Sequence, residues 1–536
     1  MGITRRALLA RVPLILTAGG LLAACGGAAA GSGGAATGTA TAASAAASAS
    51  AGSGQASGGG SKSLTIALNA YPPKMDPAQS TAYVDRQVYQ SIYDSLVTFD
   101  KGLAMKPGLA DSWDISQDGL TYTFHLHQGI KFHDGTPFNA DAVVFNTKRY
   151  QDPASPRRTE IALVESVTAT DASTVVYKLQ SPFAPLLSIL GDRAGMMVSP
   201  DAVSKQGGNV NQHPVGTGPF TFKEMVQGDH VAVVKNPAYW QPGLPKLDSV
   251  LYKAITDSNV AIAQLKAGQV GVMDTVPPNN VSDLSSDTQL VVDSVPGLGY
   301  AGFYVNLRTQ PFSSQPLRQA VSAAIDRAAY VKVMFGTAAS PIVGPFPPSS
   351  WAYDSSIAVP PANPAAAKQF LAQGGQSGGF TFTMTIPGGS PLSSQAAQVL
   401  QNMLGKVGIT MKIEEQEFGA LLGNLNKGNF TAALVGWSGR VDPDQNSYSF
   451  LATGGGNNNG GYSSPQMDQL LKQARVTSDQ AQRKQIYSQI VKLIEVDVPY
   501  VYLDAGADIK GLQKSVQGYV HIPDGLFRVA AMDVSA

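Results

Sequence analysis

Strand-forming and helix-forming runs alternate along the whole chain after residue 60, and this interleaving limits the folds that the chain can adopt. The strand-like runs are short, rich in β-branched and aromatic residues, and bounded by turn-forming residues. They are LTIAL (64–68), YTFHL (122–126), TVVYKL (174–179), FTFTMTI (380–386) and TAALVGW (431–437). The chain lacks a repeat of about 20 to 50 residues, which excludes a solenoid. The pattern predicts a mixed α/β fold.

Three helical runs carry clear start or stop signals. The run 315–335 (QPLRQAVSAAIDRAAYVKVMF) has Pro316 in its first turn and apolar residues at i, i+3, i+4 spacing, which predicts one helix with one buried face. A second helix is predicted to follow Ser464 as its cap. A third is predicted over 479–498, stopping before Pro499.

Length and charge narrow the class of protein. The body after residue 60 has about 475 residues, too many for one hydrophobic core, which predicts two or three lobes. The chain has 38 Lys and Arg against 38 Asp and Glu, and no stretch of the body is basic enough to bind nucleic acid. Nucleic acid is therefore excluded as a partner. No segment of the body reaches about 18 uninterrupted apolar residues, so none is predicted to cross a membrane.

The first 25 residues are typical of an export signal. Arginines are followed by an uncharged apolar run that ends at Cys25, the only cysteine in the chain. The ending LLAAC resembles a bacterial lipobox, so residues 1–25 are interpreted as a lipoprotein signal peptide with a lipid anchor on Cys25. A lone cysteine excludes an intramolecular disulfide, and its place at the end of the apolar run argues against a core thiol. The pair Arg5 and Arg6 leaves twin-arginine and general export open.

Residues 26–60 consist almost entirely of Gly, Ala, Ser and Thr. This composition has too little apolar bulk to offset the entropy of ordering, so the segment is predicted to be a disordered tether. About 35 such residues reach on the order of 30 Å. The folded body is thus expected to work close to a membrane surface, outside the cytoplasm.

A family resemblance lies in the stretch 107–145 (PGLADSWDISQDGLTYTFHLHQGIKFHDGTPFNADAVVF). This stretch resembles the signature of solute-binding protein family five, the dipeptide-, oligopeptide- and nickel-type binding proteins of ABC importers. Further matching segments follow in the expected order. They are VGTGPF (215–220), NPAYW (236–240), AIAQLKAGQVGVMD (261–274), GFYVNLRTQPFSSQPLRQAVSAAIDR (302–327), GYSSPQMDQLL (461–471) and IEVDVPYVYL (494–503).

The resemblance implies a bilobal periplasmic-binding-protein fold of type II, in the large peptide-binding class with an extra subdomain in lobe one. Lobe one is expected at 61–297 plus 505–536 and lobe two at 298–504, with the two crossing segments acting as a hinge. Such a protein acts as a monomer, closes over a peptide or small solute, and presents it to an ABC permease with its ATPase subunits. The family needs no cofactor.

The histidines of the signature raise the question of a metal site. On a strand, His125 and His127 point to the same face, as a pair of metal ligands would. However, Phe124 and Leu126 then form the buried face, which puts the histidines on the solvent side. His133 falls in a turn before a helix. No metal site is therefore predicted.

An enzyme is the alternative from a different class. A glycosidase needs two opposed carboxylates, but Asp442 and Asp444 lie in a proline-containing turn, where Asp is commonly a turn former. The body lacks G-x-S-x-G, H-E-x-x-H and G-x-x-x-x-G-K-[ST] motifs. We therefore expect no catalytic residues, and a secreted hydrolase remains only the runner-up.

The segment GWSGRVDPD (436–444) is the main candidate for a ligand site. Gly436 and Gly439 allow close backbone approach as the chain leaves a strand. Trp437 offers a flat apolar face and an N–H donor, with Ser438 beside it. We expect this segment to line the ligand cleft; the alternative is that Trp437 only packs between the lobes.

Arg440 is the most informative residue of this segment. In the family's peptide binders the corresponding motif resembles W-x-x-D, whose aspartate pairs with a peptide ammonium, whereas here the fourth position is Arg440. A guanidinium matches a carboxylate, phosphate or sulfonate, so the ligand is expected to have an anionic or hydroxyl-rich end. The alternative is a shifted turn in which Asp442 binds the ammonium and Arg440 braces it as an ion pair.

Other candidates for the ligand site come from the ends of strands. Tyr71 follows the first strand, and Tyr304 and Asn306 lie close to the expected hinge. Packing within the core is an equally good explanation for each. The sequence thus predicts a lipid-anchored solute receptor of an ABC importer, with a chemosensory receptor subunit as the alternative within binding proteins. Peptides, sugars, opines and metal chelates all remain open as ligands.

Overall fold

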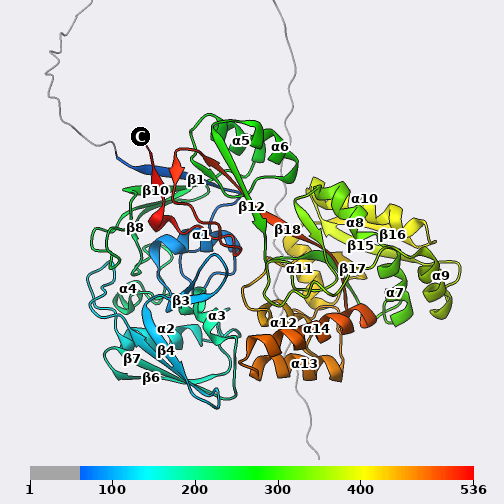
Figure 1. Cartoon of the computed structure of the whole chain (residues 1–536), viewed down its shortest axis with the longest axis horizontal. Coiled ribbons are helices and arrows are strands. Elements are labelled where there is room, and N and C mark those ends of the chain that lie inside the picture. The colour runs from blue at the N-terminus through cyan, green and yellow to red at the C-terminus, as the bar shows by residue number, and fades with distance from the viewer. Residues whose placement is uncertain (1–60, 536) are drawn as a thin grey trace, which may run out of the picture. The chain divides into compact units, whose positions relative to one another are not determined.

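One long strand, β18 (Tyr500–Gln513), runs through the largest sheet of the protein. The structure is a computed structural model that describes residues 61–535. The first half of β18 pairs with β13 (Ala301–Val305), and its second half pairs with β12 (Leu290–Pro296). Figure 1 shows β18 passing between β12 and β17. Two groups of strands are therefore joined through one continuous backbone.

The strands on the two sides of β18 combine parallel and antiparallel pairs. On one side, β15 pairs in parallel with β16 and β17; on the other, β1 pairs in parallel with β10 and β11. The remaining strands of this sheet are β8 (Phe220–Val226), β9 (His230–Lys235), β10 (Ser249–Ala254), β11 (Val272–Met273), β1 (Ser63–Leu68), β14 (Ala339–Pro341), β15 (Thr381–Pro387), β16 (Thr410–Gln416) and β17 (Ala432–Leu434).

A separate antiparallel sheet is built from residues 110–179. Its spatial order is β4 (Ala110–Ile115), β5 (Thr121–Leu126), β7 (Thr174–Leu179) and β6 (Val164–Asp171). Its inner face packs around Phe124 and Tyr177, whose rings meet edge to face with centroids 5.4 Å apart. Two further two-stranded antiparallel pairs are β2 (Val97–Phe99) with β3 (Met105–Pro107), and β19 (Val516–Gln517) with β20 (Asp533–Val534).

Helices cover these sheets. They are α1 (Tyr83–Ile92), α2 (Ala140–Tyr150), α3 (Leu186–Leu190), α4 (Pro200–Lys205), α5 (Ser258–Lys266), α6 (Val281–Ser286), α7 (Gln315–Ala324), α8 (Arg327–Phe335), α9 (Pro364–Gln373), α10 (Pro391–Gly405), α11 (Phe418–Lys427), α12 (Asp444–Leu451), α13 (Pro465–Val476) and α14 (Gln480–Asp497), with short 3-10 turns at η1 (Arg193–Gly195), η2 (Pro278–Asn280) and η3 (Val529–Ala531).

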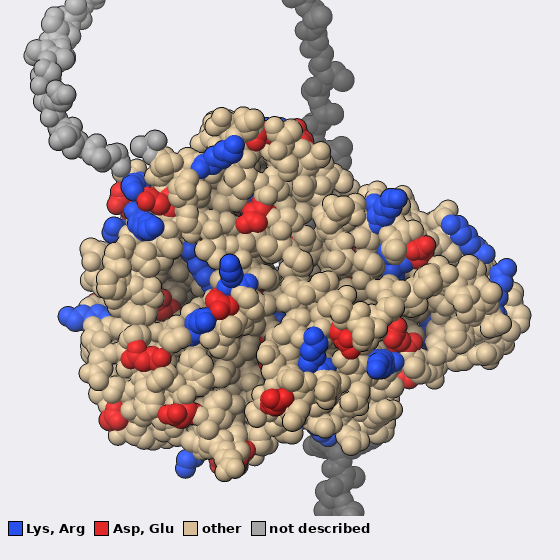
Figure 2. All heavy atoms as spheres, viewed as in Figure 1, with Lys and Arg blue, Asp and Glu red and all other residues tan. Residues whose placement is uncertain are grey.

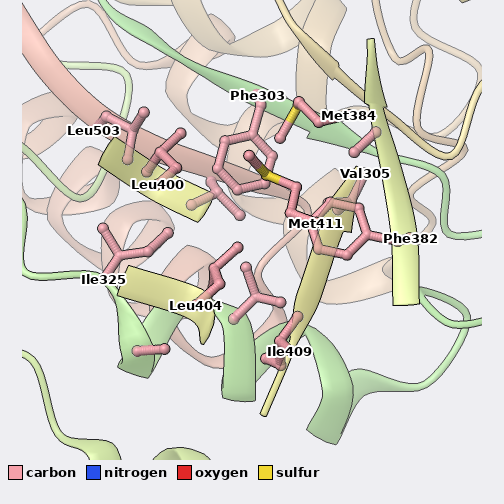
Figure 3. Close-up of a cluster of buried hydrophobic side chains, with 14 of the residues drawn as sticks. Phe303, Val305, Ile325, Phe382, Met384, Leu400, Leu404, Ile409, Met411 and Leu503 are labelled. Atoms are coloured by element: carbon pink, nitrogen blue, oxygen red, sulfur yellow. The ribbon is translucent and has the colours of Figure 1, made fainter. Parts of the chain in front are cut away.

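The core beside β13 shows why alternating apolar residues form these strands. Phe382, Met384 and Met411 point inward from β15 and β16, while Leu400 and Leu404 reach them from α10 (Figure 3). All five are at most 3% exposed. Full burial of one such side chain stabilises the fold by roughly 1.5 to 3 kcal/mol.

Most predicted elements are confirmed, including the caps. The Ser464 hydroxyl accepts the Met467 N–H at the start of α13, as predicted. At the start of α2, the Asn139 side chain likewise accepts the Ala142 N–H. The strand predicted at 431–437 is shorter than expected. It ends at Leu434, since the chain then leaves the sheet toward the turn that follows.

The prediction of one helix over 315–335 is wrong. The run forms α7 and α8, separated at Ile325 and Asp326, both of which have extended backbone. Asp326 accepts the Ala329 N–H at 2.9 Å and so starts a second helix. Arg327 donates to the Ser322 carbonyl at 3.2 Å, which satisfies the free end of the first. A side-chain cap in mid-run thus overrides the apolar periodicity.

The charged side chains on the face drawn in Figure 2 are interspersed, with Lys and Arg beside Asp and Glu. This distribution agrees with the balanced charge of the chain and gives no basic footprint on that face. Within residues 61–535, no helix combines the length and the apolar character needed to cross a membrane.

A buried carboxyl on β18 gives a testable pH dependence. Asp504 is 2% exposed, and its Oδ2 has no hydrogen-bond partner among residues 61–535. Burial raises the pKa of the Asp504 carboxyl to about 7. A carboxyl that binds its proton more tightly in the folded state costs stability as pH rises from about 4, its unfolded pKa, to about 7.

We expect Asp504→Asn to remove this cost. The free energy of unfolding of the variant minus that of the wild type should rise between about pH 4 and pH 7 and then level off, by on the order of a few kcal/mol in total. Urea unfolding at several pH values measures the difference. A difference that stays constant across that range would contradict the assignment.

Candidate functional site

The turn 436–444 is held close to the segment before β13. The N–H groups of Tyr300 and Trp437 each donate to the other's carbonyl, at 2.9 and 2.8 Å. Gly439 has φ of +78°, and a Cβ there would lie 2.2 Å from the Leu298 carbonyl. Gly436 has a similar constraint, since a Cβ would lie 2.6 Å from the Tyr300 oxygen. The glycines therefore permit a backbone approach that other residues would block.

Asn446, in the first turn of α12, fixes the shape of this turn. Its Oδ1 accepts the Trp437 indole N–H at 2.9 Å and the Arg440 backbone N–H at 2.8 Å. Its Nδ2 donates to the Arg440 carbonyl at 2.8 Å. The residue is fully buried, so one amide side chain sets the positions of both candidate ligand residues. Sequence reasoning missed Asn446, since nothing distinguishes it from an ordinary helix residue.

Trp437 and Arg440 form a stacked pair. The Arg440 Cζ lies 4.6 Å from the Trp437 ring centroid, a cation–π distance. Arg440 Nη1 donates to the Gly439 carbonyl at 2.6 Å and to the Ser438 hydroxyl at 3.2 Å. The ring of Phe450 also packs against Trp437, edge to face, with ring centroids 5.0 Å apart. The guanidinium is thus pre-positioned rather than free in solvent.

The surroundings of Arg440 disfavour the charged form of its guanidinium. Burial, followed by the charges of Arg86 and Arg193, lowers the pKa of Arg440 to about 9, while Asp192 and Glu160 partly oppose this. A nearby anion would relieve this unfavourable environment.

Asp442 forms a buried ion pair with Arg483, not with Arg440. The Arg483 Nη1 and Nη2 atoms donate to the two carboxylate oxygens at 2.9 and 2.8 Å, and the side chains are 6% and 7% exposed. Asp442 Oδ1 also accepts the Asp444 N–H at 2.9 Å. The Arg440–Asp442 pair considered from the sequence is not formed. Asp442 instead ties the turn to α14.

Asp444 makes a second pair, with Arg475 at the end of α13. Arg475 Nε and Nη2 donate to its carboxylate at 2.8 and 3.0 Å, and the Arg475 Cζ lies 3.2 Å from the Tyr448 ring centroid. The Arg475 carbonyl accepts the Ala184 backbone N–H at 2.9 Å. That bond links α13 to the segment before α3.

A cavity of about 490 Å³ lies between these groups. One side comes from residues 159–189 and the other from residues 437–475. Its lining residues are Thr159, Glu160, Ala162, Phe183, Ile189, Trp437, Arg440, Asp444, Gln445, Tyr448, Ser449, Gly454, Gly455, Gly456, Asn457 and Arg475. The volume suits a small organic solute, and aromatic and polar groups are both present.

Only some of the residues predicted to bind the solute line this cavity. Trp437 and Arg440 line the cavity, whereas Ser438 does not line it but accepts a hydrogen bond from Arg440 Nη1. Tyr304 is one contact removed, since its hydroxyl donates to the Asn457 carbonyl at 3.4 Å. Asn306 directly follows β13, and its side chain donates to the carbonyls of Gly428 and Phe430, which lie between α11 and β17. It therefore links the end of β13 to the segment that precedes β17.

Tyr71 and Gly436 do not line this cavity. The Tyr71 hydroxyl is buried without a hydrogen-bond partner among residues 61–535, and burial raises its pKa. Gly436 serves the backbone approach described above.

The histidines have separate partners. Phe124 and Leu126 are buried as predicted, while His125 pairs with Asp114 at 3.1 Å and His127 with Asp111 at 2.6 Å. His133 contacts the Gly218 carbonyl at 2.9 Å. Among residues 61–535, no group of three or more His, Cys, Asp or Glu side chains is placed to hold a metal ion.

The sequence profile of the bacterial extracellular solute-binding proteins, family 5, matches residues 104–459. The chain belongs to this family. The glutathione-binding protein GsiB of Pectobacterium atrosepticum is 31% identical to it over 487 residues, which cover 89% of the chain and 95% of that protein.

Solved structures of similar binding proteins agree with the fold. The periplasmic binding protein DppA of Helicobacter pylori, in complex with the peptide STSA, has 31% identity and a TM-score of 0.78, covering 88% of this chain and 98% of its own. The oligopeptide-binding protein AppA of Bacillus subtilis, with a nonapeptide, has 27% identity and a TM-score of 0.77, covering 89% and 100%. The predicted type II bilobal fold of the peptide-binding class is confirmed.

This family 5 chain is therefore an extracytoplasmic solute-binding receptor of an ABC importer and not an enzyme. The anchor predicted on Cys25 and the tether predicted over 26–60 lie outside the described residues.

We expect Asn446→Ala to destabilise the fold by about 1 to 3 kcal/mol, because two donors and one acceptor lose their buried partner. The variant should also weaken solute binding, since Trp437 and Arg440 lose their common support. Urea unfolding measures the loss of stability, and calorimetric titration measures the loss of solute affinity. Asn429→Ala, at an exposed amide, is the matched control and should change neither quantity appreciably. Equal behaviour of the two variants would contradict the role of Asn446.

Proposed function

We propose that this receptor binds a short peptide or peptide-like solute in the cavity between residues 159–189 and 437–475. The observation that carries the proposal is the cavity itself, with Trp437, Tyr448 and Phe183 as aromatic walls. Such walls supply favourable desolvation, while a few polar groups fix the orientation of the solute. Trp437, Ser438 and Arg440 would contact it, with Tyr304 supporting the Asn457 side of the cavity.

The similar proteins support this ligand class. GsiB is a glutathione-binding protein, and the DppA and AppA structures hold peptides. A protein with 27% identity and a TM-score of 0.77, from A. tumefaciens, holds agropinic acid. Peptide-like solutes that carry carboxylates are therefore compatible with this fold.

We propose lobe one at 61–297 plus 505–536 and lobe two at 298–504, with the crossing segments at Gly297–Tyr300 and in β18. The cavity residues then fall on opposite lobes. A solute that contacts both lobes binds the closed form better than the open form, so it shifts the population toward closure. The ABC permease would then bind the closed form of the receptor. Since one chain supplies both sides of the cavity, a monomer suffices.

Replacement of Trp437 tests the proposed cavity. Trp437→Ala should weaken binding of the peptide Ser-Thr-Ser-Ala or of glutathione by roughly tenfold or more in calorimetry, because a large apolar wall is lost. Phe418→Ala is the control, since that aromatic side chain is half exposed and outside the cavity. Unchanged affinity in Trp437→Ala, with tight binding in the wild type, would place the solute elsewhere.

We also propose that Cys25 carries the lipid anchor that holds the receptor at the cell membrane. In bacteria, the wild type should partition with membranes, whereas Cys25→Ser should be released or retained as an unprocessed precursor. Incorporation of a clickable fatty acid into the wild type, but not into Cys25→Ser, measures the anchor directly. Two or more acyl chains are needed for firm anchoring. Equal labelling of both forms would contradict it.

A further inference from the structure

The charged side chains that line the cavity differ in whether a side chain of opposite charge pairs with them. They are two acids, Glu160 and Asp444, and two arginines, Arg440 and Arg475. Glu160 is held by Arg157 Nη1 at 2.5 Å, and Asp444 is held by two Arg475 nitrogens. Both cavity carboxylates are thus already matched by a guanidinium of the protein.

Arg440 has no such match. Within residues 61–535, no carboxylate lies within 4.0 Å of its guanidinium, and of the guanidinium nitrogens only Nη1 makes hydrogen bonds, to the Ser438 hydroxyl and the Gly439 carbonyl. Its Nε and Nη2 have no acceptor in the described part of the chain. Arg440 lines the cavity, and the guanidinium edge that carries these two parallel donors has no acceptor among the described residues.

The neighbours of Arg440 increase the local positive charge. Arg86 is matched by Asp192, with contacts of 3.0 and 2.8 Å, but Arg193 donates only to the backbone carbonyls of Ser80 and Ala82. The Arg193 Nε is buried without a partner among the described residues, and the side chain is 1% exposed. Arg193 and Arg440 are thus two cations near the cavity that no carboxylate pairs with directly.

The opposite charge pattern, an acid that receives a solute ammonium, would fall to Glu160, since within residues 61–535 only one oxygen of this cavity carboxylate is held by a guanidinium, and to neither aspartate. Asp442 is buried against Arg483, and Asp444 is held at both oxygens by Arg475. Each would have to give up a bidentate, charge-assisted pair before it could bind an ammonium.

We propose that the solute presents a carboxylate to the free Nε and Nη2 edge of Arg440, with Trp437 stacked behind the guanidinium, and that its ammonium, where present, is not the anchor at this point. The inference rests on the proposed function and specifies the polarity of the ligand. A planar fork fits a carboxylate in a bidentate manner, and the Trp437 ring and the Asn446 clamp hold that fork in place. The solute carboxylate would supply the negative charge that no carboxylate among the described residues places beside the Arg440 guanidinium.

The test modifies the solute first, because this requires no variant to fold. The wild type would be titrated calorimetrically with Ser-Thr-Ser-Ala, its C-terminal amide, its N-acetyl form and glutathione. We expect the amide to bind roughly 10- to 100-fold more weakly than the free peptide, because a charge-assisted pair is lost. The N-acetyl form should stay within about threefold of the free peptide.

The variants Arg440→Gln and Arg440→Lys then test whether Arg440 is the residue that binds the solute carboxylate. In Arg440→Gln, the free peptide and its amide should bind with the same weakened affinity, and Arg440→Lys should recover part of the difference as a point charge. Arg308→Gln is the control, since that arginine lines a neighbouring cavity and not this one. Thermal midpoints confirm that each variant is folded.

The outcomes separate the two proposals. Equal binding of free peptide and amide, or loss of binding on N-acetylation alone, overturns the carboxylate anchor while the peptide-like ligand stands. Absence of binding by every probe up to millimolar concentration overturns the proposed ligand class and this inference with it. A free-versus-amide difference that survives in Arg440→Gln assigns the carboxylate to another residue and also overturns the inference.

Discussion

The structure depends on one strand that serves two sets of partners. β18 gives its first half to β13 and β14 and its second half to β11 and β12. Because buried backbone donors and acceptors are nearly always paired, both strand groups depend on this one strand for part of their hydrogen bonding. The segment Gly297–Tyr300 runs between the same groups, and the candidate site is built directly upon it.

The candidate site is organised by a few buried polar side chains rather than by the groups that would face a solute. Asn446 fixes the turn from within, and the Asp442–Arg483 pair joins it to α14. Buried, fully matched networks of this kind hold geometry well, since a single missing partner is costly. Trp437 and Arg440 can therefore be presented to the cavity in one defined arrangement.

Local signals in the sequence were sufficient for the elements and for part of the site. Apolar alternation and caps such as Ser464 predicted strands and helix starts, because these depend on residues close in sequence. The break at Asp326 was missed since its cap competes with a continuous apolar face. Trp437 and Arg440 do line a cavity, but the Asp442–Arg483 pair spans 41 positions and Asn446 has no distinctive motif. Such partners are set by tertiary packing, which periodicity does not report.

The backbone bond between Ala184 and Arg475 has a practical consequence. It is made by main-chain atoms of two segments that flank the cavity, so it persists in any variant whose backbone is unchanged. An amide in such a bond exchanges its hydrogen with solvent only when the bond opens. The exchange rate of the Ala184 amide thus reports how often the two sides of the cavity separate, without a probe attached to any side chain.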